Sequence, residues 1–598
     1  MVDPDDDVQA FYREAYDGVQ AFEYRLRNVL APSARREADY LSLLQALEAI
    51  PSPTAMVIVT RERDALLKLT RSHGPGGVGW AAFMNKLHAL ARRAGDVDLA
   101  AYAACASARA LLVSTPAAPE TYRAAKKMAG VYRDDTSCSQ GARAEAALVL
   151  GEIALDLGEL RTALREARRA LQLSVAPEVS ARCFLLAGDA DMSRGSYRAA
   201  ARNYQLAAVR VGTQTRLARD ALLRKALAEC KRGFAARALP PMKEMLSSIT
   251  TDDYPTVSLV LLEIGKRTGS DLVTQAVGSM RDLSGRALGR WRDCCRLSLG
   301  IAEVMVEAGR NDQAAGQLDY VLRMAGQFGN RPDAATAFSL LARASWSDGR
   351  MRDVLSAVRG VRRLVWPLRS GAVFGWSELL RARVAFYSGR LADALLRSTD
   401  ALATFDRAGA QMELCRAAET IAATMLWAGK IAKGVEFLTT SSGWLKSATE
   451  PLSLTRSQTL LCSACHCSDD TGMAERALGT ARGLRQLPQG PADRLLHSLL
   501  QCDVACMGNE GGAAVRSAEK AVEQAAGLRH RILEAIAYYQ LVKALCTASQ
   551  RSEAENVLAK ARSEYPFGEK MMWRDAASEL RGPMAGAVKF KPFAAFPF

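Results

Sequence analysis

The chain has 598 residues and a formal net charge of +15, and 49% of its residues are hydrophobic. It is too long for one compact core, no run of about 18 apolar residues could span a membrane, and its acidic start is unlike a signal or transit peptide. The 13 cysteines are scattered without a disulfide pattern, which indicates reduced thiols. We therefore expect an intracellular protein, cytoplasmic or nuclear, that does not insert into a membrane.

Residues 1–72 contain helical stretches without a clear repeat, and we expect them to form an N-terminal helical cap. The glycine-rich segment from His73 to Gly79 follows. It has neither a preceding strand nor the Gly-Lys-Ser/Thr sequence of a phosphate-binding loop. We therefore interpret this segment as a connector.

Two units between residues 150 and 207 share one pattern of small residues. The first unit has Gly158 and Ala163, and the second repeats them as Gly195 and Ala200, followed by Tyr204. Small residues let the two helices of a hairpin cross closely, and glycine permits the tight turn between them. The pattern resembles the tetratricopeptide repeat (TPR) family. This resemblance implies an all-α fold, a right-handed α-solenoid of about twelve TPR-like helical hairpins whose first helices line an inner, concave wall.

The most regular part of the chain is marked by four equally spaced glycines, Gly309, Gly349, Gly389 and Gly429. Each lies between two apolar helical patterns, as expected for equal helix-turn-helix units that stack into an array. We divide the chain into a cap (1–72), basic repeats (80–285), repeats with the regular period of these glycines (286–566) and a C-terminal extension (567–598).

Large aromatic residues recur at equivalent places in this regular part, namely Trp346, Trp376, Phe386, Tyr387 and Trp427. They fall on first helices, so the resemblance places them on the inner wall. Aromatic side chains in a groove supply a large contact area and frequent binding hot spots. We expect either a partner-binding groove or packing between neighbouring units.

A basic segment runs from residue 161 to 243, with 17 Lys and Arg against 6 Asp and Glu. Arginines share helical faces in two successive units, namely Arg161, Arg165, Arg168, Arg198 and Arg202. They fall on second helices, which the resemblance places on the outer side. We expect either a ridge that meets an acidic protein or a nucleic acid, or a solvated face that keeps the array soluble.

Metal, haem and catalytic chemistry find little support. Cys462, Cys465 and His466 form a Cys-x-x-Cys-His sequence, which attaches c-type haem in secreted proteins and has spacing that zinc ligands use. Here the sequence lies inside an expected repeat helix, where cysteine serves as a small filler residue. No other histidine sits in a nucleophile, metal or phosphate motif. We expect no cofactor, no metal and no enzyme activity.

The end of the chain carries four phenylalanines in nine residues, Phe590, Phe593, Phe596 and Phe598. So many exposed aromatic rings are unusual for a solvated end. Such a tail can dock on a groove as an extended peptide. The sequence leaves open whether it binds its own repeats or a partner subunit.

These observations favour a non-catalytic scaffold or adaptor subunit that mediates protein–protein interactions in a multi-subunit intracellular assembly. The alternative is a nucleic-acid-associated helical-repeat protein that uses the basic segment 161–243.

Overall fold

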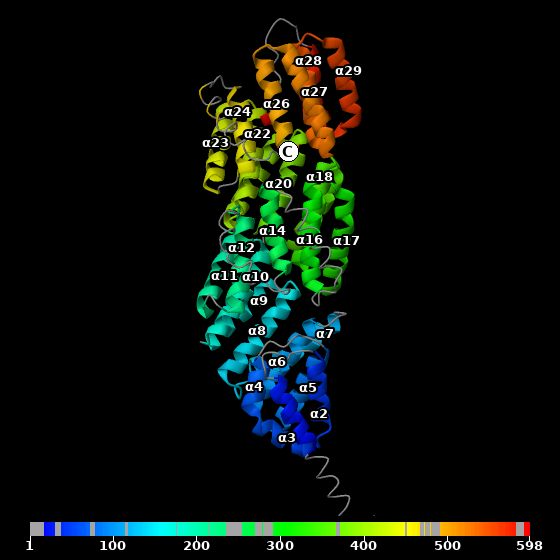
Figure 1. Ribbon diagram of the computed structural model, residues 1–598. Coiled ribbons are helices and arrows are strands. Elements are labelled where there is room, and N and C mark those ends of the chain that lie inside the picture. The colour runs from blue at the N-terminus through cyan, green and yellow to red at the C-terminus, as the bar shows by residue number, and fades with distance from the viewer. Residues whose placement is uncertain are drawn as a thin grey trace, which may run out of the picture.

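The computed structural model describes residues 17–29, 37–71, 78–113, 118–174, 176–212, 215–234, 254–268, 291–365, 371–448, 451–466, 491–581 and 591–598, with the single positions 238, 278, 472, 476 and 479. Within these ranges the chain is helical and forms no β-strand. Figure 1 shows an elongated array of stacked helices that runs from the N-terminal helices at one end to α27–α29 at the other. The prediction of an all-α helical-repeat array is confirmed.

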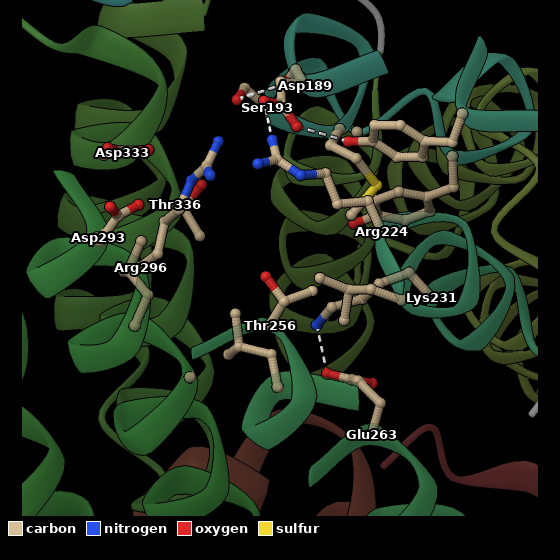
Figure 2. A pocket seen from close by; sticks show the side chains of 18 of the residues that line it. Asp189, Ser193, Arg224, Lys231, Thr256, Glu263, Asp293, Arg296, Asp333 and Thr336 are labelled. Atoms are coloured by element: carbon tan, nitrogen blue, oxygen red, sulfur yellow. Dashed lines mark hydrogen bonds and ion pairs between the residues drawn. The ribbon is translucent and has the colours of Figure 1, made fainter. Parts of the chain in front are cut away.

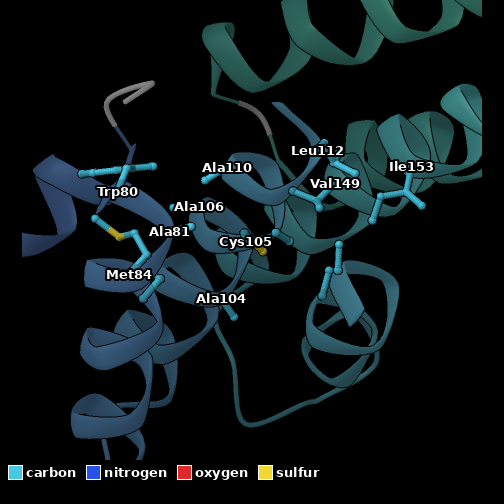
Figure 3. Packing of buried hydrophobic residues seen from close by; sticks show 14 of the residues in the cluster. Trp80, Ala81, Met84, Ala104, Cys105, Ala106, Ala110, Leu112, Val149 and Ile153 are labelled. Atoms are coloured by element: carbon cyan, nitrogen blue, oxygen red, sulfur yellow. The ribbon is translucent and has the colours of Figure 1, made fainter. Parts of the chain in front are cut away.

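The N-terminal end is a bundle of helices with many buried alanines. A helix over 17–29 precedes α2 (Glu37–Glu48), α3 (Ser52–Arg61), α4 (Arg63–Arg71), α5 (Val78–Arg93), α6 (Val97–Val113) and α7 (Pro119–Arg133). Trp80 and Met84 of α5 lie across from Ala104 of α6, and on the other side α6 meets α8 (Gln140–Asp156) (Figure 3). Small side chains therefore let three helices approach closely here.

Paired helices follow as hairpins. They are α8 with α9 (Leu160–Leu173), α10 (Pro177–Arg194) with α11 (Tyr197–Val211), α16 (Trp291–Glu307) with α17 (Asn311–Phe328), α18 (Arg331–Ser347) with α19 (Met351–Val365), α20 (Ala372–Tyr387) with α21 (Leu391–Ala408), α22 (Gln411–Trp427) with α23 (Ile431–Ala448), α26 (Pro491–Met507) with α27 (Gly511–Leu528), and α28 (Arg531–Thr547) with α29 (Arg551–Glu564).

Three further helices take the place of a first helix, namely α12 (Arg216–Arg232), α14 (Tyr254–Thr268) and α24 (Pro451–His466). The C-terminal part adds short elements, namely η4 (Pro566–Gly568), η5 (Glu569–Trp573), α30 (Arg574–Arg581) and η6 (Phe593–Ala595).

The second unit illustrates why these residues form a hairpin. Gly195 ends α10 with a φ of 74°, a left-handed conformation that suits glycine, and the amide of Ser196 closes the turn on the carbonyl of Asp191 at 2.8 Å. Tyr204 of α11 then lies flat against Gly188 of α10, where a Cβ atom would be 2.4 Å from the ring. The glycine at 188 is therefore what lets the two helices cross.

The first helices of successive hairpins form an inner layer. Helix α10 contacts α8 and α12, and the series α16, α18, α20 and α22 is continuous in the same way. Contacts also join first helices far apart in the chain, since α10 touches α18, α14 touches α24 and α18 touches α28. The array is therefore wound so tightly that its inner wall meets itself.

Successive superhelical turns are joined by specific polar and aromatic contacts. The side-chain amide of Asn330 donates to the main-chain carbonyl of Asp156 at 3.0 Å, across 174 residues of sequence. The indole of Trp291 donates to the hydroxyl of Tyr122 at 2.8 Å and stacks on Phe328 with ring centroids 4.3 Å apart. These bonds fix one turn of the superhelix against the next.

None of the helices in the described ranges is both long and apolar enough to cross a lipid bilayer.

Candidate functional site

A cavity of about 980 Å³ lies inside the array, and first helices supply most of its wall. Helices α10, α12 and α14 line one side, and α16 and α18 line the other (Figure 2). The first residues of α20 also contribute to the lining. Its lining holds charged residues of both signs, and such residues are rarely buried in proteins unless they are paired. We name this space the charged cavity.

One group of charges in the charged cavity is centred on Asp189 of α10. Its carboxylate forms an ion pair with Arg224 and accepts a hydrogen bond from the hydroxyl of Tyr204 at 2.8 Å. Burial alone would raise the pKa of Asp189, but the guanidinium groups of Arg224 and Arg296 outweigh it and lower that pKa to about 2. Asp189 is therefore an anion at any physiological pH.

Arg296 of α16 faces this group from the opposite wall. Figure 2 shows the side chains of Arg224 and Arg296 pointing towards the same space. Burial lowers the pKa of Arg296, but Asp189, Asp293 and Asp333 outweigh this effect, so the net shift is upward. Within the described part of the chain no hydrogen bond or ion pair engages its guanidinium group. Its five N–H donors therefore face the cavity.

A second group of charges surrounds Lys231 of α12. Its ammonium group contacts the carboxylates of Glu263 at 2.5 Å and Glu303 at 3.0 Å (Figure 2). The carboxylate of Glu303 also forms an ion pair with the guanidinium of Arg343 at 3.4 Å. Burial opposes the charge on Lys231, but the two carboxylates raise its pKa well above the ordinary value. The two walls of the cavity are thus joined by ion pairs.

Trp376, predicted from the sequence as a groove residue, lies in the wall of the charged cavity. The guanidinium groups of Arg343 and Arg416 lie over its ring, at 4.6 and 5.3 Å from the ring centroid. Such cation–π contacts hold both arginines in place. The indole is only 8% exposed, so the cavity presents arginine side chains in front of it.

The other four predicted groove aromatics lie on first helices and contact one another. Trp346 and Tyr387 have ring centroids 5.7 Å apart, and Phe386 lies 5.7 Å from Trp427. Trp427 is half-buried and the other three are buried. They pack between neighbouring hairpins, and Tyr387 and Trp427 also contact C-terminal residues of the same chain.

The C-terminal segment 591–598 lies against the inner wall rather than beside the last hairpin. Figure 1 places the C-terminus between α20, α22 and α26, away from the free end formed by α29, and η6 contacts α22, α24 and α26. Phe593, Phe596 and Phe598 are all buried. The fourth predicted anchor, Phe590, lies outside the described residues. We name the wall residues that hold this segment the tail cradle, namely Tyr387, Trp427, Arg456, Asp503 and Tyr539.

The tail cradle contacts the main chain of the segment at four points, one of which is the hydroxyl of Tyr387, which donates to the carbonyl of Pro597 at 3.4 Å. Asp503 accepts a hydrogen bond from the amide of Phe593 at 3.0 Å, and the hydroxyl of Tyr539 accepts one from the amide of Lys591 at 3.0 Å. Arg456 donates to the carbonyl oxygen of Phe598 at 3.0 Å. The segment is therefore held by its backbone as well as by its side chains.

Asp503 is itself supported by two neighbours on the inner wall. Lys543 of α28 contacts its carboxylate at 2.7 Å, and the hydroxyl of Ser463 donates to it at 2.7 Å. Burial opposes the charge on Lys543, but Asp503 raises its pKa. A buried ion pair of this kind fixes the direction of the carboxylate that receives the tail.

The predicted basic ridge lies on the second helices α9 and α11. The side chains of Arg161, Arg165, Arg168, Arg198 and Arg202 are all exposed. Arg165 also lies 3.7 Å from the buried carboxylate of Glu166. Two adjacent outer helices thus present five guanidinium groups to solvent.

The Cys-x-x-Cys-His sequence lies at the end of α24. Cys462 and Cys465 are buried in the apolar core, and the structure does not describe the side chain of His466. No cluster of three or more potential metal ligands occurs among the residues that the structure describes.

Sequence reasoning missed the charged cavity, Asp503, Lys543 and Arg456. A signal was present for one of them, because Lys543 lies between Val542 and Ala544 in an otherwise apolar helical stretch. A lysine on a buried helical face usually has a carboxylate partner. That partner, Asp503, lies on another hairpin, so the sequence did not identify it.

No family model matches the chain, and no curated protein matches it. Several solved structures are similar to the chain at low identity. They include a Cut9–Hcn1 hetero-tetramer of the APC/C (14% identity, 92% of this chain and 97% of that one, TM-score 0.45). Yeast Tom70 matches at 11% identity over 77% of this chain and 93% of that one, with a TM-score of 0.29.

A signal-transduction ATPase with numerous domains and a tetratricopeptide repeat sensor, from Pyrococcus horikoshii, is also similar. It matches at 13% identity over 95% of this chain and 90% of that chain, with a TM-score of 0.30. A protein with a tetratricopeptide repeat sensor is thus among the solved structures similar to this chain. Because these TM-scores are all below 0.5, the all-α repeat fold rests on the helices described above.

Proposed function

We propose that this protein is a non-catalytic scaffold or adaptor that binds other proteins in a multi-subunit intracellular assembly. One observation carries the proposal. The inner wall already holds a polypeptide segment, residues 591–598, by hydrogen bonds to its main chain and by burial of three aromatic rings. A wall that binds one segment in this way has the features of a peptide-recognition surface.

The charged cavity adds a second feature that suits a scaffold. Its ion pairs join α10 and α12 to α16 and α18, so the wall is rigid before a partner arrives. Rigid sites lose less entropy on binding than flexible ones. The donors of Arg296 face into the cavity and suit a partner's carboxylate or main-chain carbonyl oxygens.

The test is affinity purification of the tagged chain from its native cells, followed by mass spectrometry. We expect a fixed set of partners in constant proportion. Arg296→Asp on the inner wall should release part of this set. Arg323→Asp on the outer face of α17, where the side chain is 72% exposed, should leave the set unchanged and serves as the matched control. Recovery of the chain alone, as a monomer, would contradict the proposal.

A nucleic-acid-binding role is the second candidate, and the exposure of the five ridge arginines favours it. Phosphate contacts by arginine release counterions, so binding should weaken steeply as salt increases. Reversing the charge of Arg161, Arg165, Arg198 and Arg202 should abolish binding. Reversing the exposed Arg352, Arg359 and Arg363 of α19 is the control. Absence of RNA or DNA binding at low salt would eliminate this candidate.

A further inference from the structure

The tail cradle has the construction of a peptide-binding site, and the chain's own tail occupies it. Four wall groups, from α20, α24, α26 and α28, meet the main chain of residues 591–598. Main-chain contacts do not depend on the side chains of the bound segment, so they supply affinity for any peptide in the same conformation. What selects a sequence is the set of side-chain sites between these contacts.

The occupants of the two side-chain sites are the aromatic residues Phe593 and Phe596. The ring of Phe596 lies between Trp427 and Tyr539, with centroids at 5.2 and 4.8 Å. Phe593, one turn earlier in the segment, is fully buried. Edge-to-face ring contacts add about 0.5–1.5 kcal/mol each beyond the burial of area. The cradle therefore favours two phenylalanines in a Phe-x-x-Phe arrangement.

Positive charge flanks the aromatic sites at both ends of the segment. The ammonium group of Lys591 lies over the Trp427 ring, 5.9 Å from the centroid. At the other end the guanidinium of Arg456, a wall residue, lies 4.3 Å from the centroid of the Phe598 ring. A matching ligand has a basic residue two positions before its first phenylalanine and an aromatic residue at its far end.

The tail is held close to the point where it leaves the last helix. The hydroxyl of Tyr539 donates to Asp575 of α30 and accepts from the amide of Lys591, so both ends of the connection meet at one side chain. The rest of α30, to Arg581, and the short stretch 582–590 join them. A short tether of this kind gives an effective concentration of about 1 mM. The tail therefore occupies the cradle ahead of a dilute partner.

We propose that the tail cradle recognises partner proteins through a segment with a basic residue followed by Phe-x-x-Phe, in which the first phenylalanine begins a 3-10 turn, and that residues 591–598 occupy the cradle as an intramolecular competitor. The inference rests on the proposed scaffold function, because the bound ligand is a protein segment. A partner must displace the tail to bind. When the untethered tail segment has a Kd of about 10 μM, an effective concentration of about 1 mM weakens the binding of any competing ligand to the intact chain about 100-fold.

The experiment measures binding of a fluorescent peptide with the sequence of residues 591–598, Lys-Pro-Phe-Ala-Ala-Phe-Pro-Phe, by anisotropy. Three proteins are compared: the intact chain, a chain that ends at Arg581, and a chain with a protease site inserted between Arg581 and Lys591 that is cut after folding. The cut chain keeps its tail during folding, so it remains informative if the shortened chain does not fold. Circular dichroism checks the helix content of each.

We expect the probe to bind the shortened or cut chain, and to bind the intact chain about 100-fold more weakly. A control peptide with Ala in place of both Phe593 and Phe596 should bind none of them. Equal binding to the intact and cut chains would show that the tail does not compete. Absence of binding to a folded shortened chain and to the cut chain would overturn the peptide site itself.

Two further outcomes separate this inference from the broader proposals. Concentration-dependent dimerisation of the intact chain, lost on removal of the tail, would assign the segment to exchange between two copies and overturn the intramolecular arrangement. A fixed set of partners that is recovered equally by the intact and shortened chains would leave the scaffold function standing while the role of the tail cradle fails.

Discussion

The contact between superhelical turns can be tested with two glycines that are equivalent in every other respect. Gly309 and Gly429 each lie in the turn of a hairpin, with φ values of +69° and +77°, and their amides make the same type of turn hydrogen bond at 3.1 and 3.0 Å. A Cβ atom at Gly309 would lie 2.7 Å from the carbonyl oxygen of Leu528, whereas one at Gly429 would have no neighbour within 4 Å. Alanine at the two sites therefore differs only in the contact.

The expected magnitudes follow from two separate costs. A left-handed backbone costs an L-residue about 1–2 kcal/mol, and both variants incur this cost. Gly309→Ala must also separate its turn from the backbone at Leu528, since a distance of 2.7 Å is shorter than real Cβ contacts. Overpacking of this kind costs about 1–3 kcal/mol. We expect Gly309→Ala to lower the free energy of unfolding by that additional amount relative to Gly429→Ala.

The assay combines urea unfolding with hydrogen exchange, because a long repeat array need not unfold in a single step. Gly309→Ala should accelerate hydrogen exchange in α28, although α28 is far from residue 309 in the sequence. Gly429→Ala should leave exchange in α28 unchanged. Gly349 and Gly389 provide an independent pair. A Cβ at Gly349 would lie too close to Phe567, at 2.7 Å, whereas one at Gly389 would make an ordinary contact with Met571, at 3.8 Å. Equal destabilisation by Gly309→Ala and Gly429→Ala, with unchanged exchange in α28, would refute the reasoning.

Three further predictions concern the C-terminal half of the array. Lys543→Met leaves the buried carboxylate of Asp503 without its cation, so urea unfolding should show a loss of about 3–5 kcal/mol in the free energy of unfolding. The double variant Lys543→Met with Asp503→Asn should recover much of this loss. Burial, with Arg383 and Arg456 nearby, lowers the pKa of His530 to about 4. As the pH falls, His530 binds a proton in the unfolded chain before it does so in the folded chain. The free energy of unfolding should therefore fall as the pH drops from about 6.5 towards 4. Urea unfolding across that range should show a smaller fall in His530→Asn. Phe596→Ala should release the tail before the array unfolds, so hydrogen exchange at the amide of Phe593 should accelerate while α22 and α26 stay protected; unchanged protection at Phe593 would contradict the tail docking.

The hairpin architecture was predictable from the sequence because it depends on local chemistry. Gly195 and Gly309 mark turns that need a positive φ, and the aromatic ring of Tyr204 needs a small residue opposite it, which Gly188 supplies. These requirements act within a single repeat unit, so a period in the sequence reveals them.

The candidate sites were less predictable because they join residues from different superhelical turns. Asp189 of α10 and Arg296 of α16 face the same cavity from helices that are far apart in the chain. Phe593 likewise meets Asp503 from a distant part of the sequence. No local pattern encodes such a pair, since the winding of the superhelix decides which hairpins face each other. For the same reason the sequence left open whether the tail binds its own chain.

The bonds between Asn330 and Asp156, and between Trp291 and Tyr122, have a consequence for how the molecule bears tension. A solenoid whose repeats touch only their neighbours extends like a soft spring, because each interface opens a little. Here the contacts between turns lie in parallel with the chain and must break before the coil can lengthen. Pulling on the two ends should therefore give a stiff initial response, a single rupture as the turns separate, and only then the compliant extension of stacked hairpins.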